Sequence, residues 1–570
     1  MGAPFAEALI AGVERVTAWA DLLDEINVFP VADGDTGRNL VVSLAPLRRT
    51  ARGREETVRE LLLAARGNSG NIAARFFSGL LAADSLEQMT DAIRQGRDRA
   101  WEAVRDPRPG TMLTVFDALV SAVEEGAGAY DADWHGRVVG RLEAAVRSTP
   151  EFLPRLKAAG VVDAGALGAF IFLEGFFASL TAQAGTSRPV TETFRGQLAI
   201  SPGFREEGEG GCCIDTVLAI DGDQEAVAGR LAALGESVVV LRGEGCLKVH
   251  LHARDGQQMR SDIAALGEVV RWSVDDLGAQ VDAFRKRPAG QAVHIMTDAA
   301  GSLTREEAGR LGITLLASYI SIAGRSLPET HLSPEELYPA MRRGVKVSTS
   351  QASLFERQER YRSVLERHRR VLYLAVGSAY TGNVSAAAEW KQANDRADRF
   401  TIIDTGAASG RLGLLAVAVA RFARSAADAE AVVRFSRATL ERCQEYVFLD
   451  RLQYLAAGGR LSRGSAFFGD MLHMKPVISP QPDGARKMGV VRDGDGQIRF
   501  ARERLEEGLA GNGTGALIML EYTDNAAWVT EAVLPEIAGR YPGAEILLSP
   551  MSLTSGAHMG PGTWGVAFLP

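Results

Sequence analysis

The spacing of the hydrophobic residues changes near residue 200, and this change limits what the chain can fold into. Residues 1 to about 185 carry Ala, Leu, Arg and Glu at helical spacing, as in VRELLLAARG and VFDALVSAVEEGAGA, with short glycine-rich breaks between the runs. Apolar residues that recur every three to four positions indicate amphipathic helices. We therefore expect an all-α domain over residues 1–185.

Strand-like segments begin after this point. CCIDTVLAI, ESVVVLRG and LKVHLHA have the character of strands, whereas DQEAVAGRLAALG and MRSDIAALGEVV have helical spacing. The order β-α-β-β-α predicts a small α+β domain of the ferredoxin-like type over residues 200–286.

From residue 291 onward, strands and helices alternate to the end of the chain. Expected strands include AVHIMTDAAGSL, RRVLYLAVGS and RFTIIDTG, and expected helices include AAAEWKQAN and GRLGLLAVAVARFARS. Such alternation predicts a parallel sheet covered by helices. Residues 291–570 are long enough for one large α/β domain or for two lobes.

Composition and charge exclude several classes of protein. A formal net charge of -8 argues against a general nucleic-acid binder, and four cysteines cannot form a disulfide framework. The first residues lack the basic start of a signal peptide, and the longest apolar runs have about half the length of a membrane-spanning helix. We expect a cytoplasmic protein.

Two aspartates lie one residue apart on a glycine turn within Asn27–Gly37. Asp33 and Asp35 can face one hard cation, and Mg²⁺ prefers carboxylate oxygens and bridges to phosphates. Alone, such a turn is as often a plain surface loop.

Three further small-residue turns precede helical runs: Arg66–Gly70, Gly110–Met112 and Asp163–Gly165. Backbone N–H groups at these helix starts can face phosphate. Taken singly, each turn is more often a helix cap, but the ordered set indicates a nucleotide site.

His250 and His252 are separated by one residue in an expected strand and therefore share one of its faces. Cys212 or Cys213, in another strand, can add a thiolate to make a zinc-binding set. The alternative is two strand histidines beside a buried thiol, with no metal.

Polar groups recur at strand ends and turns in the C-terminal half: Thr349–Gln351, Thr381, Arg460 and His558. The sequence has no serine elbow that would make a catalytic triad. Hydroxyl, guanidinium and imidazole donors suit the binding of a carboxylate or an acyl phosphate better than bond cleavage. Each of them alone is more often a cap or turn residue.

The N-terminal pieces NVFPVADGDTGRNL, ARGNSGNI, GTMLTV and GVVDAGALG resemble the nucleotide-binding domain of fatty acid kinase, which is similar to the ADP-binding L subunit of dihydroxyacetone kinase. The resemblance implies a barrel of antiparallel helices with Mg-ADP at one rim. It also implies that Asp33 and Asp35 bind Mg²⁺ as the catalytic pair, and that the nucleotide is lined by Thr36, Asn39, Ser69, Gly70, Thr111 and Asp163.

Two positions depart from that family. Asn27 stands where the kinase subunit has a third metal-binding aspartate, and Arg38 replaces a residue that is usually small. A neutral ligand at Asn27 is expected to weaken the magnesium site or to change the number of ions.

The middle segment is similar to the middle domain of fatty acid kinase. This resemblance implies Cys213, His250 and His252 as ligands of a zinc ion, structural or regulatory, that lies far from the phosphoryl chemistry in the sequence.

The stretches MTDAAGSL, VSTSQAS, AYTGNVSAA, LAAGGRLS and AHMGPGTWGV resemble the DegV family of fatty-acid-binding proteins. The resemblance implies two α/β lobes with an apolar tunnel between them. It places the fatty acid carboxylate on Thr349, Thr381, Arg460 and His558, with Arg492 near the exit.

Together the resemblances imply a phosphotransferase that converts ATP and a fatty acid into ADP and an acyl phosphate, with Mg²⁺ as cofactor and a structural Zn²⁺. One alternative is a lipid-binding or lipid-sensing protein with an inactive kinase domain, which Asn27 and Arg38 favour. A second is a kinase of a small hydroxy-carbonyl compound similar to dihydroxyacetone. Expected partners are a fatty acid and ATP and not nucleic acid. A membrane surface or an acyltransferase is a candidate for a transient contact, and a second copy of the chain is a candidate for a homodimer.

Overall fold

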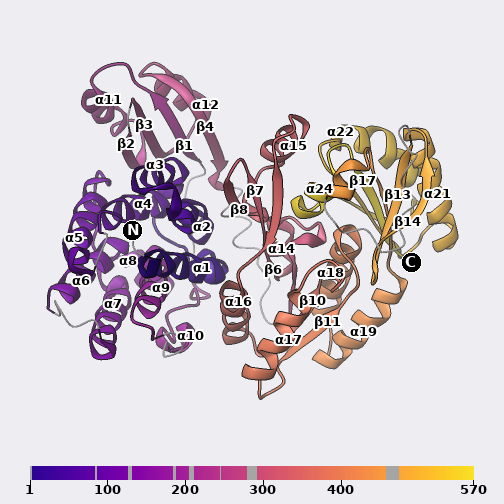
Figure 1. The fold of residues 1–570 in the computed structure, drawn as a ribbon, viewed down its shortest axis with the longest axis horizontal. Coiled ribbons are helices and arrows are strands. Elements are labelled where there is room, and N and C mark those ends of the chain that lie inside the picture. The colour runs from indigo at the N-terminus through magenta and orange to yellow at the C-terminus, as the bar shows by residue number, and fades with distance from the viewer. Residues whose placement is uncertain are drawn as a thin grey trace. The chain divides into compact units, whose positions relative to one another are not determined.

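The computed structural model describes residues 3–83, 86–125, 131–183, 188–204, 211–243, 245–278, 281, 292–457 and 474–570 (Figure 1). The chain divides into two compact units, Met1–Lys286 and Arg287–Pro570. None of the helices in these described segments has the length and apolar character needed to cross a membrane.

The first part of unit 1 is helical, as predicted (Figure 1). Helix α9 is buried on almost every side and packs against α1, α6 and α7, because nearly all of its residues are small or apolar. Stacked rings of Phe76 and Phe116, with centroids 3.9 Å apart, join α4 to α6 in the same core. The elements are α1 (Ala3–Glu25), α2 (Thr36–Leu44), η1 (Ala45–Arg52), α3 (Arg54–Ala64), α4 (Gly67–Leu80), α5 (Leu86–Glu102), α6 (Met112–Glu124), α7 (Ala132–Phe152), α8 (Pro154–Ala159), α9 (Ala164–Leu180) and α10 (Val190–Thr193).

The second part of unit 1 is a four-stranded antiparallel sheet with two helices. The sheet order is β2-β3-β1-β4, which with the chain order β-α-β-β-α-β is the ferredoxin-like arrangement that the sequence predicts. The elements are β1 (Cys212–Ala219), α11 (Gln224–Leu231), β2 (Glu236–Gly243), β3 (Cys246–Ala253), α12 (Gly256–Ala264) and β4 (Glu268–Asp276).

The helix predicted over MRSDIAALGEVV is wrong in its second half. Helix α12 ends at Ala264, and the residues from Glu268 onward form β4. The β-branched pair Val269 and Val270 follows Gly267, and this combination favours a turn and a strand over a longer helix.

The two faces of this sheet have different partners. Ile214, Leu218 and Val249 pack against the helices α11 and α12. On the opposite face, Val239 and Leu241 pack against alanines of the helical part, and α3 and α4 contact β2 (Figure 1). The side chains of β1 and β3 that share this second face therefore point toward the start of α4.

The first lobe of unit 2 is built on a four-stranded parallel sheet of order β11-β10-β5-β6, which confirms the predicted alternation there. A separate antiparallel sheet of order β8-β7-β9 accompanies it. The elements are β5 (His294–Asp298), η2 (Ala299–Gly301), α14 (Arg305–Leu311), β6 (Ile313–Leu316), β7 (Ser318–Ile322), β8 (Arg325–Pro328), η3 (Glu329–His331), α15 (Pro334–Arg342), β9 (Val347–Gln351), α16 (Leu354–Arg367), β10 (Val371–Ala375), α17 (Asn383–Asn394), β11 (Phe400–Asp404), α18 (Ser409–Ala423) and α19 (Ala429–Arg442).

The second lobe has a mixed sheet of order β14-β13-β12-β17-β15-β16, so the expectation of a parallel sheet is wrong here. Among the described strands of this sheet, β15 and β16 alone pair in parallel. The two residues between Gln481 and Gly484 can connect only antiparallel neighbours. The elements are β12 (Gln444–Phe448), α20 (Gln453–Ala457), β13 (Lys475–Gln481), β14 (Gly484–Val491), α21 (Gly494–Gly508), β15 (Leu517–Tyr522), α22 (Ala526–Trp528), the π-helix η5 (Val529–Val533), α23 (Leu534–Arg540), β16 (Glu545–Pro550), α24 (Leu553–Met559) and β17 (Trp564–Leu569).

Candidate functional site

A chain of hydrogen bonds joins four of the predicted nucleotide-site residues in unit 1. The Asn27 amide donates to Asp33, and the Thr36 hydroxyl donates to Asn27 Oδ1 at 2.8 Å. The Thr36 and Ser69 hydroxyls lie 3.5 Å apart. Two turns that are 33 residues apart in the sequence are thus in contact.

The starts of four helices gather at this point. Gly67 opens α4 with φ +60, and a Cβ there would collide with the Asn39 amide of α2. A Cβ on Gly165, in the first turn of α9, would lie 3.2 Å from Ser69 Oγ and 3.3 Å from Met112 Cε at the start of α6. The first N–H groups of a helix have no partner within it and favour anions. The arrangement suits a phosphate chain.

The two aspartates of the turn influence each other. Burial and the neighbouring Asp35 charge raise the pKa of Asp33 well above its usual range. A bound cation removes this repulsion, so the pair fits a divalent metal ion. Asp35 is buried and also faces Arg38, whose Nη2 lies 3.6 Å from Asp35 Oδ2.

Thr111 and Asp163 cap helices. Thr111 Oγ1 accepts from the Leu113 N–H at 3.4 Å, and Asp163 Oδ1 accepts from the Ala166 N–H at 2.7 Å. Burial raises the pKa of Asp163 to about 7, although the helix N–H groups lower it. Gly70 packs against Ser43 of α2.

Sequence reasoning missed Asp24, a buried residue near the end of α1. Its Oδ1 accepts from the N–H groups of Gly37 at 2.7 Å and Arg38 at 3.2 Å, and so holds the start of α2 in place. The sequence does contain a signal for a buried, hydrogen-bonded carboxylate here: an acidic residue at one of the apolar positions of an amphipathic helix.

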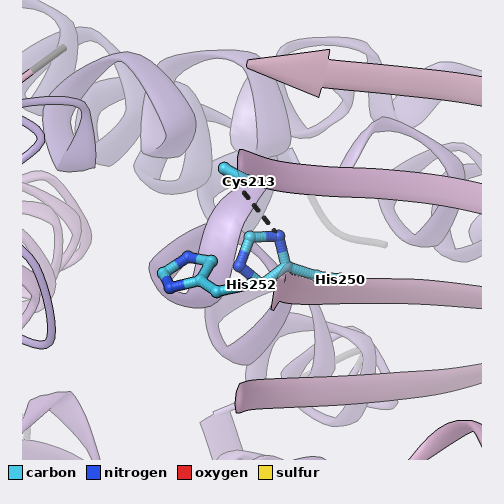
Figure 2. Close-up of side chains that lie close together, drawn as sticks. All are labelled: Cys213, His250 and His252. Carbon is cyan, nitrogen blue, oxygen red and sulfur yellow. Dashed lines mark hydrogen bonds between the residues drawn. The ribbon is translucent and has the colours of Figure 1, made fainter. Parts of the chain in front are cut away.

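The predicted metal ligands Cys213, His250 and His252 converge on one face of the sheet β2-β3-β1-β4, the face that packs against α3 and α4 (Figure 2). The strand register pairs Cys213 with His252 across β1 and β3. All three are buried, and their ligand atoms lie within 4.8 Å of one another. Cys213 Sγ is 3.9 Å from His250 Nδ1.

The chemistry of these three side chains fits a metal ion such as zinc. His250 Nε2 is buried and has no hydrogen-bond partner among the described residues. Burial lowers the pKa of His252 to about 3, so its ring is neutral and able to bind a metal. Burial raises the pKa of the Cys213 thiol well above its ordinary value, and a metal ion would reverse this by stabilising the thiolate.

Asp215 was not among the residues expected from the sequence; it pairs with His250 across the same two strands. Burial alone would raise the pKa of Asp215, but His250 and Lys248 hold it below the usual range. The spacing Cys213-Ile-Asp215 places the thiol and the carboxylate on one strand face and was the available signal.

The metal cluster and the aspartate turn are far apart in the sequence but close in unit 1. The charges of Asp33 and Asp35 act on the Cys213 thiol. Arg38 Nη2 also lies 3.7 Å from Asp275 Oδ2 of β4. The middle sheet therefore borders the candidate nucleotide site.

In unit 2, Thr349 of β9 and His558 of α24 are in contact, with Oγ1 and Nε2 2.9 Å apart. Both line a cavity together with Thr381, whose hydroxyl accepts from the Asn383 N–H at 3.0 Å. Three predicted carboxylate ligands thus share one cavity.

The rest of the cavity lining combines polar and apolar residues. Apolar lining comes from residues such as Val376, Leu455, Ile478 and Met559. Such a lining suits an acyl chain with a polar head. Asp298 also lines the cavity and accepts from Tyr373, Val376 and Asn383; burial raises its pKa to about 6.

Neither predicted arginine is among the described residues that line this cavity. Arg460 lies outside the described residues. Arg492 is exposed just after β14 and is not among the residues that line the cavity.

Three family models match successive parts of the chain. The DAK2 domain model matches residues 30–178, and the middle-domain model of fatty acid kinase (FakA-like) matches residues 210–284. The model named uncharacterised protein, DegV family, matches residues 292–570.

Curated relatives match about half of the chain. Protein YloV of Bacillus subtilis is 30% identical over 310 residues, which are 49% of this chain and 56% of that protein. The chain thus spans about half the length of the curated relatives it matches.

Solved DegV-family structures cover 49% of this chain. One, titled fatty acid binding of a DegV family protein from Thermus thermophilus, is 24% identical with a TM-score of 0.44 and is 99% covered. DegV, a fatty acid binding protein from Bacillus subtilis, is 20% identical with a TM-score of 0.45 and is also 99% covered.

Proposed function

Because this chain joins a DAK2 domain, a middle domain like that of fatty acid kinase and a DegV-family domain, we propose that it phosphorylates the carboxylate of a fatty acid with Mg-ATP. The products are an acyl phosphate and ADP. The three domains supply, in this order, the nucleotide site, a metal-binding sheet beside it, and the site for the lipid.

The observation that carries the proposal is the contact between the Asp33 turn and the Ser69 turn at four helix starts. The helix N–H groups favour phosphate charge, and Asp33 and Asp35 offer carboxylates to a divalent ion there. Magnesium, when bound, offsets the charge that spreads over the transferring phosphoryl group. The chain's own part is to hold the nucleotide and to limit its movement.

A carboxylate substrate is supported by the cavity of unit 2. Thr349, Thr381 and His558 offer two hydroxyls and an imidazole beside an apolar lining. Hydrogen bonds from such donors to an ionised oxygen are stronger than bonds between neutral groups. We therefore assign these three residues to the fatty acid carboxylate.

The proposed reaction needs no further reactant. A carboxylate oxygen forms a bond to the γ-phosphorus, and the bond from that phosphorus to the β,γ-bridging oxygen breaks. The electron pair leaves with ADP, and no proton is transferred. Because one chain carries both domains, the effective concentration of the lipid-binding domain at the nucleotide-binding domain is higher than for two separate proteins.

A lipid-binding protein with an inactive kinase domain is the rival that specific observations favour. Asn27, which donates to Asp33, is an amide and gives the site no third carboxylate. Arg38 pairs with Asp35 and neutralises part of its charge. Both features weaken a magnesium site. This rival predicts fatty acid binding without Mg-nucleotide binding.

The test is an ATP-dependent acyl hydroxamate assay with oleate and the full chain. We expect hydroxamate with the wild type and its loss with Asp33→Ala plus Asp35→Ala and with His558→Ala. Asp91→Asn, on the exposed face of α5, is the matched control and keeps activity. Calorimetry with Mg²⁺ and a non-hydrolysable ATP analogue distinguishes the kinase from the lipid-binding protein with an inactive kinase domain, which predicts no heat of nucleotide binding. Phosphorylation of dihydroxyacetone in place of oleate would instead favour a small hydroxy-carbonyl substrate.

A further inference from the structure

Asp215 lies between the two candidate sites of unit 1 and contacts both. Its Oδ2 accepts a hydrogen bond from the Gly67 N–H at 3.3 Å. Its Oδ1 lies 3.4 Å from His250 Nδ1. One carboxylate therefore joins the first residue of the nucleotide loop to a predicted metal ligand.

The contact with Gly67 acts on the loop that begins α4. Gly67 is followed directly by Asn68, Ser69 and Gly70, and the Ser69 hydroxyl meets Thr36. The N–H of Gly67 belongs to the first turn of the helix and has no partner within it. Asp215 supplies that partner from another domain, so the position of the loop depends on the position of β1.

The contact with His250 acts on the metal cluster. Asp215 Oδ1 and His250 Nε2 are both buried without a hydrogen-bond partner among the described residues, and Oδ1 lies 3.4 Å from His250 Nδ1. A rotation of the ring that lets Nδ1 donate to this carboxylate leaves Nε2 for a metal ion, so the carboxylate is in reach to orient the ring. In metal sites generally, a carboxylate that accepts from the second nitrogen of a ligating histidine orients the ring, and its loss lowers metal affinity roughly 10- to 100-fold. Asp215 has the position of such a residue.

The surroundings keep Asp215 in place. Its side chain is 15% exposed, and it lies on the sheet face that packs against α3 and α4. The neighbouring Lys248 Nζ donates to Leu63 O at 3.3 Å, so a second polar contact crosses the same boundary. A shift of β1 therefore moves the carboxylate relative to both Gly67 and His250.

We propose that Asp215 is a positioning residue that serves both sites, so that metal binding at Cys213, His250 and His252 and nucleotide binding at the Ser69 loop strengthen each other. This inference rests on the proposed function for its nucleotide half. A metal ion orders His250 and hence Asp215, and Asp215 then holds the Gly67 N–H and the loop in the binding geometry. Such coupling is reciprocal: each ligand changes the affinity of the other by the same factor.

The test uses the full chain, Zn²⁺ and Mg-ADP, so that no turnover takes place. Zinc affinity is measured by competition with a chromophoric chelator, with and without Mg-ADP, and Mg-ADP affinity by calorimetry, with and without Zn²⁺. For the wild type we expect each ligand to tighten the other about tenfold. For Asp215→Asn we expect zinc affinity to fall at least about tenfold. The factor by which each ligand changes the affinity of the other should then approach one.

Asp275→Asn is the matched control. It removes an acidic side chain on the neighbouring strand that also crosses to the helical part, through Arg38, but it does not touch the Gly67–Asp215–His250 contacts. Because Asp275 lies opposite Cys213 and shares Arg38 with Asp35, each affinity alone can change in this variant, and the control applies only to the coupling factor. We expect it to keep the coupling between zinc and Mg-ADP. Equal loss of coupling in both variants would show that general docking of the two domains, and not Asp215, is responsible.

A second measurement needs no variant at Asp215. With Co²⁺ in place of zinc in the wild type, addition of Mg-ADP is expected to shift the visible absorption of the metal. Wild-type zinc affinity in Asp215→Asn, or an unchanged cobalt spectrum on binding of Mg-ADP, overturns the inference. If neither the wild type nor any variant binds Mg-ADP, the proposed function fails, and so does the part of the inference that concerns the nucleotide. The zinc affinity of Asp215→Asn then decides by itself whether Asp215 positions His250.

Discussion

Arg38 Nη2 lies between two carboxylates, 3.6 Å from Asp35 Oδ2 and 3.7 Å from Asp275 Oδ2. Although burial alone would lower the pKa of this guanidinium, Asp35 and Asp275 raise it, so the charge is permanent. A fixed cation therefore occupies the side of Asp35 that faces the middle sheet. It competes with any metal ion for the same negative charge.

The first prediction concerns Arg38→Ala. Removing the guanidinium is expected to tighten Mn²⁺ binding in the absence of nucleotide by about 1 kcal/mol, or roughly fivefold, the size of one charge pair at this distance in a water-like medium. Electron paramagnetic resonance of free Mn²⁺ measures this. Arg59→Ala, which removes an exposed arginine of α3, is the control and leaves the affinity unchanged. Weaker Mn²⁺ binding in Arg38→Ala would contradict competition.

The second prediction concerns Asn27→Asp. Asn27 donates to Asp33, so a carboxylate at this position replaces a favourable contact by a repulsive one. We expect lower thermal stability without metal, tighter Mg²⁺ binding, and recovery of stability when Mg²⁺ is added. Thermal unfolding of wild type and variant, each with and without Mg²⁺, measures all three. If Asn27→Asp is as stable as the wild type without metal, the hydrogen bond from Asn27 to Asp33 does not contribute to stability, and the prediction is wrong.

The third prediction concerns pH and Glu329. This buried carboxyl accepts from the Thr554 N–H at 3.0 Å, and burial raises its pKa from 4.5 to about 7. Since the folded protein binds this proton more tightly than the unfolded chain, Glu329 lowers stability as pH rises from about 4.5 to 7. The loss is about 3 kcal/mol and is complete above that range.

Glu329→Gln keeps the shape and removes the titration, so its stability should fall less between these pH values than that of the wild type. Denaturant unfolding at several pH values measures the difference. Glu389→Gln, which changes an exposed residue of α17, is expected to follow the wild type. Parallel curves for Glu329→Gln and the wild type would count against the raised pKa.

The fourth prediction concerns Thr349→Val. The substitution removes the hydroxyl that contacts His558 while keeping the shape of the side chain. We expect oleate affinity to fall about tenfold, because hydrogen bonds to charged groups contribute more than neutral ones. Displacement of a fluorescent fatty acid measures this. Ser348→Ala, on the exposed side of β9, is the control and binds as the wild type does.

The helical spacing of residues 1–185 and the ferredoxin-like order of the middle region were readable from the sequence, because each depends on local periodicity. Strand β4 was not predicted, because Val269 and Val270 continue the apolar helical spacing of α12, and this spacing was given more weight than the turn signal at Gly267. The mixed sheet of the second lobe depends on which strands pair across the lobe, and spacing along the chain carries little information about this.

The candidate sites divide in the same way. Motifs with tight local spacing, such as Asp33 with Asp35 and His250 with His252, lie together in the structure. Asp24 and Asp215 were missed because their partners, the start of α2 and the start of α4, come from other elements. Arg38 was noted only as an unusual residue, and its contact with Asp275 depends on the docking of β4.

The central claim is transfer of phosphate from ATP to a fatty acid carboxylate, and phosphorus-31 NMR of the full chain with ATP, Mg²⁺ and ¹⁸O-labelled oleate tests it most directly. The account predicts an acyl phosphate signal with the isotope shift of a bridging ¹⁸O, which is absent when Asp33 and Asp35 are both replaced by Asn. A protein that binds Mg-ATP and oleate but forms no acyl phosphate, or an equal signal from the double variant, would contradict it.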